Sequence, residues 1–137
     1  MKRTTSPILA VALFTGFAVL AGATAAKSSL RDEPTVTEGL IAVAIAYELS
    51  ERCDDLSARR LAGINYLWGL RGEAERLGYS DAEIDAFVED DAEKDRLEGI
   101  ARARLTALGV VEGQEATYCA VGRGEIAGGT AAGALLR

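Results

Sequence analysis

The spacing of apolar residues is the feature that most restricts the fold of this chain. From residue 35 onward, apolar residues recur at three- and four-residue steps, and no stretch alternates apolar and polar residues over the length of a strand. The sequence also lacks Asn-Gly and Asp-Gly, the dipeptides typical of tight hairpins. These patterns predict an all-α fold, a small bundle of four to five helices.

Capping signals divide this region into helices. A capping box is a Ser, Thr, Asp or Asn followed three residues later by Glu, and each side chain then bonds the backbone of the other. Gly78 and Gly109 are placed to end the second and fourth helices. The expected helix starts are Thr35, Ser57, Ser80, Asp90 and Glu112.

The apolar positions of each helix predict its buried face. The run of residues 40–49 is apolar on almost every side, which predicts a helix surrounded by others, although so short a run also fits a buried strand. The expected inner faces of the next three helices are Leu61, Ile64, Leu67 and Leu70; then Ile84, Phe87 and Val88; then Leu97, Ile100, Ala101, Leu105 and Leu108.

The N-terminus has the pattern of a secretory signal peptide. A basic start at Lys2 and Arg3 precedes an apolar or small stretch, residues 8–21, and the small residues 23–25 form an A-x-A cleavage site. The alternative is an uncleaved anchor, but 14 residues are short for a bilayer span of roughly 20. We therefore predict a signal peptide over residues 1–25, a single helical domain over residues 26–137, and a periplasmic or secreted protein.

The net charge argues against nucleic acid as a partner. Cleavage after Ala25 would remove two basic residues and no acidic one, which leaves 13 basic against 21 acidic side chains and a net charge of −8. Nucleic-acid phosphates and anionic lipids both require a basic surface. We expect no nucleic-acid partner and no direct membrane span after cleavage.

The two cysteines, Cys53 and Cys119, predict one disulfide. In an exported chain an even number of cysteines indicates a bond, and this bond would tie the end of the first helix to the last helix. A redox-active pair is the alternative, but such pairs usually stand as C-x-x-C.

The residue types available argue against catalysis. The chain contains no histidine, so a Ser-His-Asp or Cys-His site is excluded within one chain, and a zinc site has no recognised ligand spacing. The acidic cluster of residues 89–95 has Arg96 where an EF-hand loop requires glycine. Catalysis by carboxylates alone is the remaining enzymatic alternative. We expect no enzymatic activity, no metal and no cofactor.

A few residues are candidates for contact with a protein partner. Tyr66 and Trp68 are two residues apart, so both cannot face one core, and an exposed aromatic residue can anchor a partner. The apolar C-terminus has to dock or stay exposed. The small residues Ala120, Gly124, Gly128 and Ala132 fall at four-residue steps and would admit a close helix. The candidate contacts are Trp68, Tyr66, Arg123, Leu135 and Leu136.

Three segments carry a resemblance to a known family. They are residues 40–46 leading to Cys53, residues 77–84, and residues 119–137 with Gly122, Arg123 and Glu125-Ile126-Ala127. With these segments the chain resembles a family of short exported bacterial proteins that carry a domain of unknown function. The resemblance implies paired cysteines, a helical fold and no assigned catalytic residues. It also implies a link to the respiratory NADH–quinone oxidoreductase, as an accessory protein on the outer face of that membrane complex.

Two functions therefore stay open. The first is a non-catalytic exported accessory or interaction protein, peripherally associated with a respiratory membrane complex. The second is a periplasmic helical module that binds a small ligand between its helices.

Overall fold

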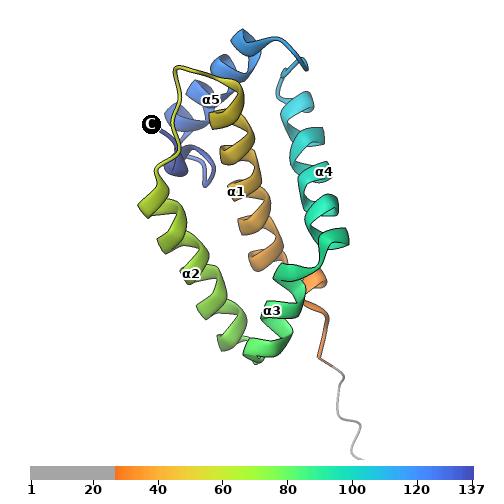
Figure 1. Ribbon diagram of the computed structural model, residues 1–137. Helices are drawn as coiled ribbons and strands as arrows, with labels where there is room; N and C mark the ends of the chain where they lie inside the picture. Colours follow the sequence, from red (N-terminus) through yellow and green to blue (C-terminus); the bar gives the residue numbers. More distant parts are fainter. Residues whose placement is uncertain (1–26) are drawn as a thin grey trace, which may run out of the picture.

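The computed structural model describes residues 27–137, which form an all-α domain with no strand in that range (Figure 1). The fold class expected from the sequence is confirmed. The signal peptide expected over residues 1–25 lies outside the described residues. The helices are α1 Pro34–Arg52, α2 Arg60–Arg76, α3 Asp81–Glu89, α4 Asp91–Ala107 and α5 Glu115–Gly128, with the 3-10 helices η1 Leu30–Asp32 and η2 Gly133–Leu135.

Helix α1 is the centre of the domain. It contacts α2, α4 and α5, and Figure 1 shows α2 and α4 on its two sides, joined by α3 near its N-terminal end. Leu49 of α1 and Leu105 of α4 are almost completely buried in the main core. These three packed neighbours account for most, but not all, of the apolar sequence of α1: Leu40, Val43 and Ala44 are only half-buried, and Tyr47 is exposed.

A disulfide joins Cys53 and Cys119, as expected. Cys53 is the residue that follows α1, and Cys119 lies within α5. The two Cα atoms are 5.2 Å apart, and both side chains are buried. The bond thus fastens the end of the central helix to the last helix of the domain.

Two of the expected helix caps are correct. Ser80 accepts a hydrogen bond from the backbone N–H of Glu83, and the Glu83 carboxylate accepts one from the backbone N–H of Ser80. Asp90 accepts bonds from the backbone N–H groups of Ala92 and Glu93 at the start of α4. Charged and hydroxyl side chains at these starts satisfy donors that the helix itself leaves unpaired.

Three other expected starts are wrong. Helix α1 begins at Pro34 rather than after Thr35, because the fixed φ angle and missing N–H of proline suit the first helical position. Helix α2 begins at Arg60, because the backbone of Ser57 instead exchanges two hydrogen bonds with Arg137, of 2.9 and 3.0 Å. Helix α5 begins at Glu115, after a turn at Gly113.

The C-terminal segment is part of the core. Leu135 and Leu136 are buried in the main cluster, and Leu136 forms an isolated antiparallel bridge with Ala58. Gly133 lies directly on the backbone of α5, where a Cβ atom would overlap Glu125. The apolar end of the chain therefore docks within its own domain.

The expected stripe of small residues on α5 does not form a helix contact. Ala120, Gly124 and Gly128 are exposed, and no atom lies within 4 Å of a Cβ built on Gly124. The close approach occurs at Gly122 instead, where Leu56 packs against the bare backbone. The rotation of α5 about its own axis determines which glycine is approached closely. Four-residue spacing does not determine that rotation, and in this fold the glycine is Gly122.

Candidate functional site

Helix α2 carries apolar residues on two of its sides. Ala62, Tyr66, Leu70 and Ala74, at four-residue steps, face the domain and are buried or half-buried. Gly39 of α1 permits this packing, because a Cβ there would lie 2.5 Å from Leu70 Cδ2. A second set, which we call the α2 stripe, is exposed to solvent: Leu61, Ile64, Leu67 and Trp68, with exposed fractions of 78%, 51%, 41% and 66%.

The expected inner face of α2 is therefore largely wrong. Leu61, Ile64 and Leu67 point away from the core, and of the expected set only Leu70 packs inward. Val88 of α3 and Leu108 at the end of α4 are also exposed, against expectation. Neighbouring helices cover only one side of these elements, and the sequence pattern alone does not say which side.

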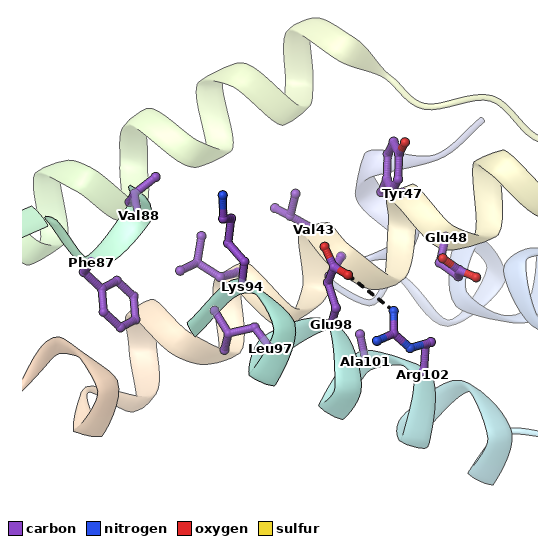
Figure 2. Close-up of a pocket in the computed structure, with 12 residues that line it drawn as sticks. Val43, Tyr47, Glu48, Phe87, Val88, Lys94, Leu97, Glu98, Ala101 and Arg102 are labelled. Carbon is purple, nitrogen blue, oxygen red and sulfur yellow. Dashed lines mark hydrogen bonds and ion pairs between the residues drawn. The ribbon is translucent and has the colours of Figure 1, made fainter. Parts of the chain in front are cut away.

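The α2 stripe borders a groove that runs along α1. Two adjoining cavities, of about 320 and 330 Å³, form this groove and share Leu40, Phe87 and Val88. Figure 2 shows one of them, with α1 as its floor and α4 as one wall. We call the whole surface the α1 groove; it is lined by Leu40, Val43, Ala44 and Tyr47 of α1, Ile64, Leu67 and Trp68 of α2, Phe87 and Val88 of α3, and Leu97 and Ala101 of α4.

Most of the large exposed hydrophobic residues gather around this groove. Among residues 27–137, nine large hydrophobic side chains are exposed. Six of them line the α1 groove or the cavity that continues it at the start of α2: Tyr47, Leu61, Ile64, Leu67, Trp68 and Val88. Contiguous apolar surface of this kind marks a binding site more often than scattered residues do.

Charged side chains at the rim of the groove are paired within the chain. Glu98 pairs with Arg102 at 3.3 Å, as Figure 2 shows, and Lys94 pairs with Asp91 at 2.6 Å. Helix α2 contributes Arg71, whose pKa is raised above its ordinary value by hydrogen bonds to Asp85 and Asp81. The groove therefore offers an apolar floor between neutralised pairs, which suits an apolar occupant.

Comparison with protein families gives one match. Residues 28–137 match the family of unknown function DUF5333. The chain belongs to that family. Neither the curated proteins nor the solved structures contain a match to it.

The DUF5333 domain does not bring the expected partner contacts into one site. Trp68 lies on the α1 groove, and Tyr66 is half-buried on the inner side of α2. Leu135 and Leu136 are buried, so they are not available on the surface for a partner. Arg123 is exposed on α5, 3.6 Å from a carboxylate oxygen of Asp55.

Sequence reasoning missed most of the groove residues of this DUF5333 domain. The sequence pattern places Tyr47, Ile64, Leu67 and Val88 in the core. One signal was available: α2 has apolar residues at positions 61, 64 and 68 as well as at 62, 66 and 70. A helix with two apolar sides needs cover on both, and the described part of the domain covers only one of them.

The DUF5333 domain contains one close group of metal-ligand types within its described residues. Cys53, Cys119 and Glu115 place their ligand atoms within 4.8 Å of one another. The two sulfurs are bonded to each other and are not thiolates, and Glu115 accepts a hydrogen bond from the backbone N–H of Asp54 at 3.0 Å. This group is therefore accounted for by the disulfide and by a loop contact.

Most titratable groups with shifted pKa values in residues 27–137 lie in surface pairs, with Lys94 and Arg71 at the groove rim. The exception is Tyr79, which is buried and has a pKa raised mainly by that burial. Glu33, Glu38, Glu73, Glu83 and Asp91 all have a lowered pKa, in each case because a hydrogen-bonding neighbour favours the charged carboxylate. No helix within residues 27–137 combines the length and the apolar character that a membrane span requires.

Proposed function

We propose that this chain is a non-catalytic, exported interaction protein that docks a helix of a protein partner in the α1 groove. The observation that carries the proposal is the gathering of six large exposed hydrophobic residues around this groove. An amphipathic helix binds such a groove through apolar residues spaced three and four apart. Trp68 and Tyr47 are the aromatic anchors expected to contribute most, because hot spots are rich in Trp and Tyr.

The dimensions of the groove fit a helix. Helix α2, with 17 residues, is about 25 Å long at a rise of 1.5 Å per residue. A partner helix of three to four turns, roughly 20 Å, would therefore contact α2 on one side and α4 on the other. It would supply the second neighbour that α2 lacks.

Export is supported by the disulfide and by the N-terminal sequence pattern. Disulfides persist in oxidising compartments and are rare in the cytosol. The resemblance noted above proposes the respiratory NADH–quinone oxidoreductase as the complex with which the protein associates from the outer face.

A photo-crosslinking residue in place of Leu67 tests the proposal. The variant is produced in the native host, its membranes are irradiated, and the products are separated by mass. We expect an adduct that requires light and that joins position 67 to a second protein chain. The matched control carries the crosslinker at Ile126, which is exposed on α5 and remote from the groove lining. Equal adducts at both positions, or none at position 67, contradict the proposal.

A small-ligand-binding module is the second candidate. Cavities of about 320 and 330 Å³ fall at the lower end of the range for ligand pockets. An apolar fluorescent probe tests it: a small ligand would raise the probe's emission in the native protein, and Leu67→Asp would remove the effect. Binding of a helix partner would also be lost in Leu67→Asp. That loss would occur even if the native protein does not bind the probe.

A further inference from the structure

Helix α2 has an exposed face that intramolecular packing does not explain. The four residues of the α2 stripe are followed on the same helix by Gly69 and Gly72, and no atom lies within 4 Å of a Cβ built on either. Glycine is unfavourable in a helix interior, and nothing within the domain requires it here. The exposed face of α2 therefore combines the large indole of Trp68 with two glycines that carry no side chain.

The exposed apolar area matches what a dimer needs. The six hydrophobic residues around the groove are 41% to 78% exposed, so at roughly 150–250 Å² for each fully exposed residue they leave on the order of 700 Å² in water. A standard interface takes about 800 Å² from each partner. The largest apolar patch on a typical monomer is smaller, about 300–600 Å². A second protein chain of similar footprint accounts for this area better than a small molecule does.

The two ends of α2 carry opposite charge. At the first end, Arg60 and Arg137 line a cavity with Glu51, and Arg60 forms no ion pair within residues 27–137. At the other end, carboxylates outnumber guanidinium groups four to two: Arg71 lies 3.4 Å from Glu75 and 2.8 Å from both Asp81 and Asp85, and Arg76 pairs with Glu73. The basic end of one copy is thus complementary to the acidic end of another copy that runs in the opposite direction.

We propose that a second copy of this chain is the occupant, with the two α2 helices packed antiparallel along their stripes. In this arrangement Arg60 of each copy faces Glu75 of the other. The same register places Trp68 against Leu67 of the second copy, at the centre of the interface. The inference rests on the proposed function, because it names the partner of the same groove.

Sedimentation velocity tests the arrangement. The sample is the protein purified from its host in the processed form. We expect the sedimenting mass to double between sub-micromolar and about 100 µM, a range typical of modest interfaces. The emission of Trp68, the single tryptophan of the chain, should shift to shorter wavelength over the same range. Leu61→Glu should weaken association at least tenfold. Leu108→Glu, which changes an exposed leucine outside the groove, should leave it unchanged.

A charge exchange tests the antiparallel register. Arg60→Glu and Glu75→Arg should each weaken the dimer at least tenfold, because each places like charges opposite one another. The double variant restores the pair in reversed sense and should recover the dimer. Failure of the double variant to recover it, with helical content unchanged by circular dichroism, overturns the antiparallel arrangement.

The outcome also separates this inference from the proposed function. A protein that stays monomeric at every concentration overturns the second copy as occupant. If the same protein crosslinks through position 67 to a different chain, the groove still docks a partner and only its identity is wrong. If position 67 forms no adduct with any chain, both proposals fail.

Discussion

Tyr79 organises the contacts that hold the first described residues against α3. Its hydroxyl lies 2.6 Å from the carbonyl oxygen of Ser28 and 2.8 Å from a carboxylate oxygen of Glu33. The ammonium group of Lys27 lies 4.4 Å from the centre of the Tyr79 ring and 2.8 Å from Glu83 Oε2. Side chains that are distant in sequence therefore fix residues 27–33 in place before α1 begins.

The ion pair of this network gives a pH-dependent prediction. The Lys27 ammonium and the Ser80 N–H and hydroxyl groups lower the pKa of Glu83 from 4.5 to about 2. Because the folded pKa lies below the ordinary value, the stabilisation is present above about pH 4.5 and is lost as the pH falls toward 2. Glu83→Gln keeps the capping bond and removes the charge. We expect it to unfold at a lower temperature than the native protein at neutral pH, with the difference disappearing toward pH 2.

Thermal unfolding followed by circular dichroism at several pH values measures this difference. Glu112→Gln is a suitable control, because Glu112 is exposed and forms no ion pair within residues 27–137. A difference between the native protein and Glu83→Gln that stays constant from neutral pH to pH 2 would contradict the assignment.

Two glycines near the C-terminus predict opposite effects of the same substitution. A Cβ on Gly133 would overlap the Glu125 carbonyl group and lie 2.7 Å from the backbone N of Ile126, and backbone atoms cannot rotate away. Gly133→Ala should therefore destabilise the protein by about 2–3 kcal/mol. Gly124→Ala, in open space within α5, should instead stabilise it by up to about 1 kcal/mol. Chemical denaturation of the two variants checks both signs.

Among the elements, α4 and α1 begin in physically different ways. Asp90 caps α4 with its own carboxylate, whereas α1 begins at Pro34 with no side-chain cap. The α4 start thus depends on one side chain, and the α1 start depends on proline geometry and on packing. Helix α2 likewise has no side-chain cap and is held at its start by the C-terminal segment.

This difference predicts unequal costs for two alanine substitutions. Asp90→Ala should destabilise the protein by about 1 kcal/mol, the usual value for a lost N-cap. Thr35→Ala should change the stability by only a few tenths of a kcal/mol, because Thr35 is exposed and caps nothing. Urea unfolding of both variants measures the two free energies. Equal losses would show that α1 depends on Thr35 after all.

For the whole molecule, the disulfide closes a loop that contains three of the helices. Cys53 and Cys119 are 66 residues apart, and α2, α3 and α4 all lie between them. Closing a loop of this length reduces the entropy of the unfolded chain by an amount worth about 4 kcal/mol. That is a large part of the 5–15 kcal/mol that stabilises a typical domain.

Removal of the bond should therefore lower the stability of the whole domain. We expect the Cys53→Ala/Cys119→Ala variant to lose about 4 kcal/mol, since both sulfurs also lie in the core. Guanidinium unfolding of the variant, beside native protein with and without reductant, measures the loss. A reduced protein as stable as the oxidised one would mean that the loop closure contributes nothing.

Those parts of the fold that depend on local chemistry could be predicted from the amino-acid sequence. The all-α class follows from three- and four-residue spacing, and the α3 and α4 starts follow from capping side chains next to the helices they cap. The endings at Gly78 and Gly109 follow from φ angles of +92° and +104°, which glycine adopts readily. The cysteine pair followed from a count of two and an expected oxidising compartment.

The rotation of each helix, and therefore the site, depends on packing between segments that are distant in sequence. Leu61, Ile64 and Leu67 are expected inside but are exposed, with Ile64 and Leu67 on the α1 groove, because α1 packs against the side of α2 that carries Tyr66 and Leu70. The backbone of Ser57 forms its hydrogen bonds with Arg137, a residue 80 positions away. Local spacing shows that a face is apolar, but contacts between distant segments determine which apolar face is buried and which remains for a partner.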